Sequence, residues 1–110
     1  MRAIAFLLPL LAAAGLGCES APPPKMPTRA AGCEVTVYRG AVPHGTKVTR
    51  LSEVVASCGK NDADSDCIRA LQDEVCKLGG DVVYEVPAEP KEESDTMLRY
   101  EGIAGTTTTP

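Results

Sequence analysis

The feature that most constrains the fold of this chain is a set of four cysteines: Cys33, Cys58, Cys67 and Cys76. In a small exported chain an even number of cysteines predicts a disulfide framework, and four cysteines allow three pairings. They lie in a segment of about 75 residues, a size at which domains bury little surface and commonly need covalent links. Because the sequence has no Trp and only one Phe, we expect an aliphatic core stapled by two disulfides.

The N-terminus has the pattern of an export signal. Arg2 supplies a positive charge, residues 3–14 form an apolar run, and small residues precede a fifth cysteine, Cys18. The run is shorter than the about 20 residues that a membrane-spanning helix needs. Residues 15–18 (Gly-Leu-Gly-Cys) resemble a lipobox. We therefore expect residues 1–17 to be a lipoprotein signal peptide and Cys18 to carry the lipid that anchors the mature chain to a membrane.

Residues 18–32 are expected to join the lipid to the folded domain. Four prolines in this stretch favour an extended polyproline conformation, which predicts a tether without fixed structure. The residue after Cys18 is Glu19, whereas an aspartate at this position is the signal that retains such lipoproteins in the inner membrane. We therefore expect the outer membrane as the location, with the domain facing the periplasm or the cell surface.

The charge of the chain argues against a nucleic-acid partner. The whole sequence has a net charge of −4, and loss of residues 1–17 removes Arg2 and leaves 10 basic and 15 acidic side chains. Binding to phosphates requires clustered Lys and Arg side chains, and no such cluster is present in the sequence.

Alternating apolar and polar residues predict four strands. The alternation in the second strand slips, which indicates a bulge near Ser52. Pro87 ends the third strand, and the acidic segment 88–95 is predicted to be a long exposed hairpin loop before the fourth. The predicted strands span residues 33–38, 47–57, 81–86 and 96–104.

A helix is predicted between the second and third strands. Asp64 or Ser65 can cap its start, and Gly79-Gly80 is a typical helix end. Charged residues spaced by four can pair on the solvent side; they are Arg69, Asp73 and Lys77. Apolar residues at steps of three and four define the buried face; they are Ile68, Leu71, Val75 and Leu78.

These elements predict an α+β domain over residues 33–105 in the order β-β-α-β-β. A small four-stranded sheet would carry the helix on one face. The first two strands are expected to form an antiparallel hairpin. Residues 106–110 are of low complexity and are predicted to be a disordered tail.

Four short segments resemble the RcsF-like family of envelope lipoproteins and the related YbjQ-type domains. They are residues 35–38 (Val-Thr-Val-Tyr), 51–58, 67–83 and 100–104 (Tyr-Glu-Gly-Ile-Ala). The resemblance implies an α+β fold and a lipoprotein that senses envelope stress through contacts with protein partners. The family's bridges use cysteines near the end of the chain. No cysteine follows Cys76 here, so the pairing must differ.

Helix geometry excludes one of the three pairings. Cys67 and Cys76 would lie about 13 Å apart along one helix, beyond the reach of a disulfide. Cys58 and Cys67 flank a short loop and are expected to bond. A hairpin of the first two strands would then bring Cys33 to the level of Cys76. We favour Cys58–Cys67 with Cys33–Cys76, and the pairing that joins Cys58 to Cys76 remains open.

The sequence gives only weak signs of metal binding or catalysis. Cys58, Cys67 and Cys76 lack the close pairs that are typical of structural zinc sites. The resemblance to YbjQ-type domains, some of which are described as heavy-metal binders, implies a metal- or small-ligand-binding lipoprotein as the alternative function. His44 beside Cys33 would be the one Cys–His pair, with nothing to orient it. Asp62, Asp64 and Asp66 begin like a calcium loop but lack its later ligands. We expect a binding protein, with no enzymatic activity and no cofactor.

Replacement of the predicted lipid-bearing residue tests the first of these expectations. Cys18→Ala should release the protein from membranes, because no other acylated residue is predicted. Membrane fractionation and uptake of labelled fatty acid measure this. Equal membrane retention of the variant, with no label in the wild type, would show that the lipidation assignment is wrong.

Overall fold

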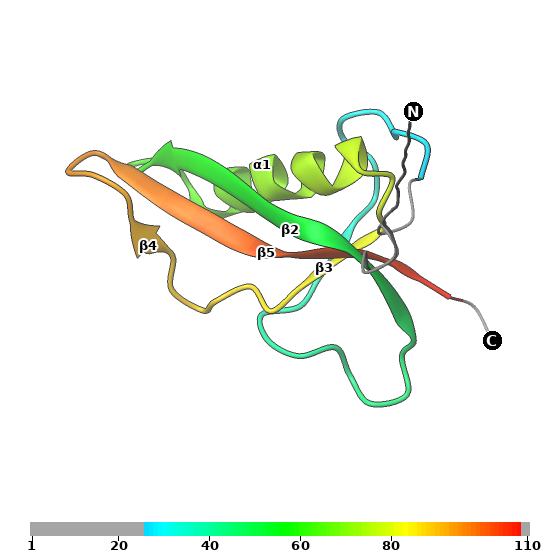
Figure 1. Ribbon diagram of the computed structural model, residues 1–110. Helices are drawn as coiled ribbons and strands as arrows, with labels where there is room; N and C mark the ends of the chain where they lie inside the picture. The colour runs from blue at the N-terminus through cyan, green and yellow to red at the C-terminus, as the bar shows by residue number, and fades with distance from the viewer. Residues whose placement is uncertain (1–25, 109–110) are drawn as a thin grey trace, which may run out of the picture.

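The computed structural model describes residues 26–108, which form one helix and a mixed five-stranded sheet (Figure 1). The fold is α+β, and one face of the sheet carries the helix. The elements follow one another along the chain as β1 (Thr36–Val37), β2 (Val48–Gly59), α1 (Asp64–Lys77), β3 (Val82–Tyr84), β4 (Lys91–Glu92) and β5 (Met97–Thr107).

The antiparallel pair β2–β5 is the longest pairing in the sheet. A register shift between Arg50 and Ser52 interrupts it, so the predicted bulge near Ser52 is confirmed. The extra residue lets Leu51, only 4% exposed, be buried although its spacing from the buried Val54 breaks the alternation. Val54 and Cys58 face the helix, whereas Val55 stays 39% exposed on the opposite face.

The predicted hairpin of the first two strands is wrong. The order of strands is β1-β3-β5-β2, so β1 lies at the far edge from β2 and pairs with β3 in parallel. The backbone N–H of Tyr38 donates to Val83, and that of Glu85 donates to Gly40. The chain between β1 and β2 therefore crosses the whole width of the sheet.

The helix begins one residue earlier than a side-chain cap would place it. Ala63 is the N-cap residue and makes no side-chain capping bond, so the predicted caps Asp64 and Ser65 are wrong. The Asp64 carboxylate is instead used in a tertiary contact. Leu71 and Val75 lie fully buried against the sheet, and both helical cysteines are buried beside them.

The charges on the helix pair differently from the prediction. Arg69 and Asp73 form the expected ion pair at 2.9 Å, but Lys77 pairs with Glu74 at 2.9 Å rather than with Asp73. The Asp73 carboxylate has another partner, because its Oδ1 accepts the backbone N–H of Gly32 at 2.9 Å.

That bond belongs to a segment that was predicted to be a free tether. Residues 26–32, which we call the N-terminal strap, pack along the C-terminal half of α1. Thr28 Oγ1 donates to the Lys77 carbonyl, the Arg29 N–H donates to the Cys76 carbonyl, and Arg29 Nη1 donates to Gly80 at 2.7 Å. The folded part thus includes the strap as well as the predicted domain. The rest of the tether, Cys18 and the signal peptide lie outside the described residues.

Two further boundaries move. β5 continues through Thr107, whose N–H and hydroxyl both donate to Asp81, so residues 106–108 are ordered and not a disordered tail. The acidic segment 88–95 contains β4, which pairs with β5. Lys60 donates a hydrogen bond to the Glu92 carboxylate at 2.7 Å, and the Ser57 hydroxyl donates one to Glu93 at 2.8 Å. This segment is therefore docked on the sheet.

Two glycines with positive φ test the strap. A Cβ on Gly79 (φ 79°) would lie 2.5 Å from the Met26 Cβ and the Pro27 carbonyl oxygen, whereas one on Gly45 (φ 95°) would meet nothing within 4 Å. Gly45→Ala should cost about 1–2 kcal/mol through φ alone.

Gly79→Ala should cost more and should also release the strap, which is measured as faster amide exchange at Arg29 and Gly32. Equal stability loss in the two variants, with the Arg29 amide still protected, would mean that the strap does not depend on this close contact.

Candidate functional site

Two disulfides fasten α1 at its two ends. Cys58 at the end of β2 bonds to Cys67 in the first half of the helix, with 5.8 Å between the Cα atoms. Cys33 bonds to Cys76 at the helix end, with 6.0 Å between the Cα atoms. These are the pairs that the sequence analysis favours.

The route by which Cys33 reaches Cys76 differs from the predicted one. The segment before β1 runs along the side of the helix, where Arg69 Nη2 donates to the Cys33 carbonyl and Gln72 Nε2 donates to Val35. No hairpin with β2 is involved. This segment also explains why Cys76 is fully buried, although it lies off the centre of the predicted apolar face.

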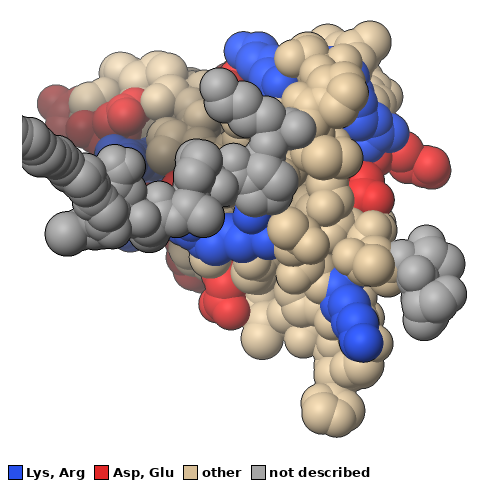
Figure 2. Space-filling model, turned by 45° about the vertical axis from the view of Figure 1, so that its right-hand side comes forward, with Lys and Arg blue, Asp and Glu red and all other residues tan. Residues whose placement is uncertain are grey.

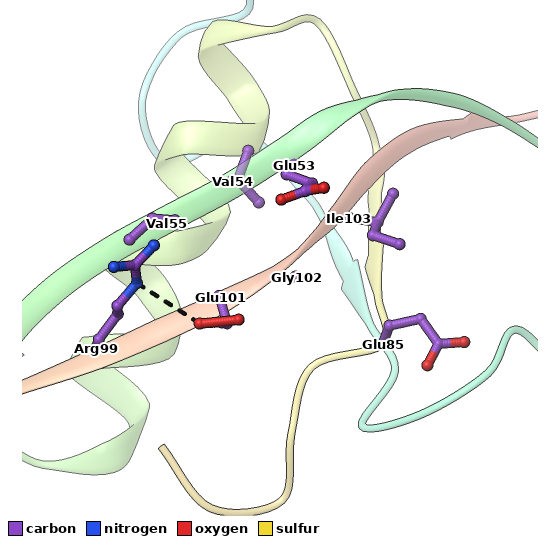
Figure 3. A pocket seen from close by; sticks show the side chains of 8 residues that line it. All are labelled: Glu53, Val54, Val55, Glu85, Arg99, Glu101, Gly102 and Ile103. Carbon is purple, nitrogen blue, oxygen red and sulfur yellow. Dashed lines mark ion pairs between the residues drawn. The ribbon is translucent and has the colours of Figure 1, made fainter. Parts of the chain in front are cut away.

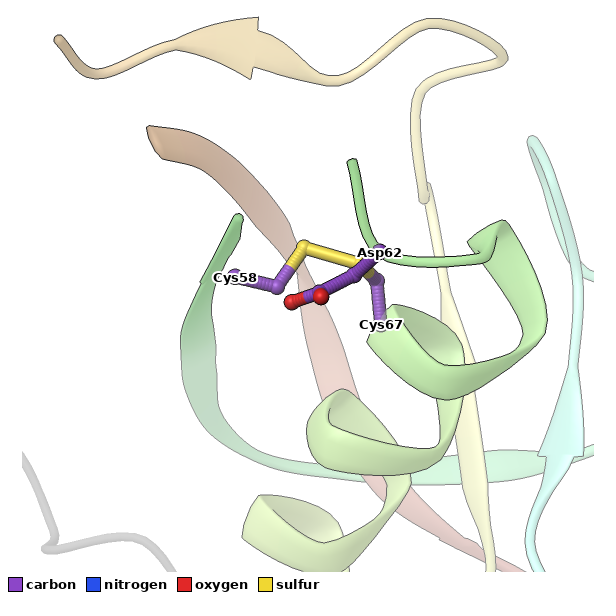
Figure 4. Close-up of side chains that lie close together, drawn as sticks. All are labelled: Cys58, Asp62 and Cys67. Carbon is purple, nitrogen blue, oxygen red and sulfur yellow. A yellow bond between two sulfur atoms is a disulfide. The ribbon is translucent and has the colours of Figure 1, made fainter. Parts of the chain in front are cut away.

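The one group of possible metal ligands among residues 26–108 is Cys58, Asp62 and Cys67 (Figure 4). The two sulfur atoms are bonded to each other, so neither is a thiolate ligand. Asp62 Oδ2 accepts the Gly59 N–H at 2.8 Å, which closes the turn between β2 and the helix. In the oxidised protein these three residues therefore hold the loop between β2 and α1 closed and do not form a metal site.

A second cluster joins three elements around Asp64. Its carboxylate accepts the Tyr100 hydroxyl at 2.7 Å and Arg39 Nη2 at 2.8 Å. The Tyr100 hydrogen bond, followed by Arg39, lowers the pKa of Asp64. Burial of the ring, followed by the bond to Asp64, raises the pKa of Tyr100. The cluster ties the segment after β1 to the start of α1 and to β5.

The other residues singled out in the sequence do not converge on a reactive centre. His44 lies exposed in the connection between β1 and β2. The sulfur of Cys33, its one possible nucleophilic partner, is bonded to Cys76. Asp62 and Asp64 point to different partners, a backbone N–H of the turn and the Arg39–Tyr100 pair respectively.

The sheet face opposite the helix is open and contains a hollow of about 220 Å³ (Figure 3). We call it the open-face hollow. Charged and apolar residues of β2 and β5 line it, together with Glu85 just after β3. The lining residues are Glu53, Val54, Val55, Glu85, Arg99, Glu101, Gly102 and Ile103.

Sequence reasoning did not find this hollow. The sequence pattern that could have indicated it is the polar side of the alternation in β2 and β5, where Val55 and Ile103 interrupt a row of charged residues. What the sequence could not supply is the part contributed by Glu85, whose φ of 55° turns the chain away from β5.

Charge on the surface is mixed. Lys and Arg side chains are separated by neutral and acidic residues on the face shown in Figure 2. In the part of the chain that the structure describes, no helix is long and apolar enough to cross a membrane.

Together these features define a small disulfide-linked α+β domain with one covered and one open sheet face. No protein-family model, curated protein or solved structure matches the chain.

The Asp64 cluster gives a pH-dependent prediction. A carboxyl group whose pKa is lowered on folding stabilises the fold above its unfolded pKa, and that contribution is lost as the pH falls through the folded pKa. Tyr100→Phe removes the largest cause of the lowered pKa, so the pKa of Asp64 should rise toward 3.8 and the acid-sensitive part of the stability should shrink.

Nuclear magnetic resonance titration of the Asp64 carboxyl and acid unfolding measure these two effects. Tyr38→Phe is the matched control, because the structure gives the Tyr38 hydroxyl no contact with Asp64. An unchanged Asp64 pKa in Tyr100→Phe would contradict the assignment.

Proposed function

We propose that this chain is an outer-membrane lipoprotein whose disulfide-linked domain acts by binding another envelope protein. The observation that carries the proposal is the asymmetry of the sheet. One face is sealed by α1, and the other presents Val55 at 39% exposure beside the open-face hollow. The support lies in the combination of this exposed valine, the hollow beside it and the charged side chains around both, because interfaces join an apolar centre to a polar rim.

Two features support the envelope location. The N-terminal sequence has the pattern of a lipoprotein signal with Cys18 as the acylated residue. Two disulfides connect the described domain, and disulfides persist in oxidising compartments such as the periplasm. The resemblance to RcsF-like lipoproteins adds a role in envelope-stress signalling to the proposal. The oxidised state of Cys58 and Cys67 disfavours the metal-binding alternative.

The experiment uses a photo-crosslinking amino acid in living cells. Position 55 on the open face is compared with position 74 on the helix, whose glutamate side chain is 38% exposed. We expect a defined envelope protein to be captured at high yield from position 55 and at least about tenfold less from position 74.

Equal capture from the two positions, or capture of abundant proteins alone, would refute the binding role. Thiol titration of the denatured protein, with and without reductant, tests the alternative. Free thiols from the four domain cysteines in the unreduced protein would favour metal binding.

A further inference from the structure

We propose that the open-face hollow receives the cationic side chain, lysine or arginine, of an extended segment of the partner protein. This inference rests on the proposed protein-binding function and specifies the chemistry of the partner.

The hollow lies at a break in the sheet. On the edge of β5 that faces β3 and β4, Tyr84 pairs with Ile103 and Lys91 pairs with Arg99. No residue of β3 or β4 is paired with Glu101, which lies between these two positions. The chain leaves the sheet at Glu85 and rejoins it at β4, which leaves a gap beside the middle of β5.

The backbone at this gap is oriented for a further strand. Gly105 and Met97 carbonyls accept N–H groups from Asp81 and Glu93 on the same edge. In an antiparallel strand every second residue directs its backbone groups to the same side, so the N–H and C=O of Glu101 also point toward the gap. A short extended segment can bond there as sheet edges commonly do.

The carboxylates around the hollow form the three longest ion pairs in the described part of the chain. Arg50–Glu53, Lys91–Glu101 and Arg99–Glu101 have N–O distances of 3.5, 3.3 and 3.5 Å. The four other ion pairs in residues 26–108 measure 2.7 to 2.9 Å. Glu85 makes no ion pair with any described residue. Three glutamates and one arginine line the hollow, and Arg50 and Lys91 pair with two of these glutamates from outside the lining. The long pairs and the unpaired Glu85 leave acceptor capacity for a further cation.

The shape of the hollow selects an organic cation over a metal ion. Among the described residues, no three of these carboxylates bring donor atoms within 4.8 Å of one another, so they do not form a metal cage. A space of about 220 Å³ is smaller than the usual pocket for a drug-sized ligand and suits one long side chain. Val55 and Ile103 can contact its methylene stem while the glutamates hold its charged end.

Defined peptides test this proposal on the full chain in nonionic detergent micelles. The probe is a capped heptapeptide of alternating valine and threonine with one central arginine. The matched control has citrulline in that place, which keeps the shape and removes the charge. Chemical shifts of the ¹⁵N-labelled protein should change at Val55, Glu85, Glu101 and Ile103. The citrulline peptide should bind at least about tenfold more weakly.

Two variants complete the test. Glu101→Gln should weaken the arginine peptide about tenfold, because it removes a charge-assisted bond, and Glu85→Gln should weaken it less. Glu74→Gln on the helix is the control and should change nothing. Equal binding of the two peptides, shift changes confined to other surfaces, or no shift change at about 5 mM peptide would overturn the proposal.

The outcome is separable from that of the proposed function. Capture of an envelope partner in cells without peptide binding at the hollow would leave the function standing and remove this site. Peptide binding at the hollow without capture in cells would support this site and refute the proposed function.

Discussion

The fold depends on a single helix that is covalently fastened at both ends. The Cys58–Cys67 bond closes a short loop of sequence separation 9, and the Cys33–Cys76 bond spans a separation of 43. Each bond stabilises a domain of this kind by about 2–4 kcal/mol, with more expected from the longer loop. Between the two bonds Leu71 and Val75 supply the apolar contact with the sheet. Without Trp or a core Phe, this aliphatic layer is thin, and the bonds keep the helix against it.

The sequence predicted the elements whose signals are local. The periodicity of Leu71 and Val75 identified α1, and the slip near Ser52 identified the bulge in β2. Both depend on neighbours within one element. The placement of β1 was missed because a parallel pair with β3 has no turn between its strands and so no local signature. The N-terminal strap was missed because its prolines favour an extended chain, and an extended chain can be free or docked.

In the candidate site, too, the sequence predicts the part that depends on one element and misses the part that depends on distant segments. The alternation of β2 and β5 places Val55 and Ile103 on the face away from the helix, so half of the open-face hollow could be predicted. The other half comes from Glu85, which has a left-handed φ at a residue that is not glycine. Distances along the helix favoured the disulfide pairs. The hairpin expected to bring Cys33 to Cys76 is absent, and the segment between the strap and β1, which runs beside the helix, brings the two sulfurs together.

The strap also determines how the molecule transmits tension. A pull on the N-terminal end of the described chain first loads the hydrogen bonds of Thr28 and Arg29 at the end of α1, and then that of Gly32 to Asp73. Once these have parted, the force reaches Cys33 and passes through a covalent bond into the helix. The slack released is only the length of the strap, and the second bond, Cys58–Cys67, passes the load from the helix to β2 through a covalent link. The two bonds therefore keep the helix on the sheet while the N-terminal end of the described chain is pulled.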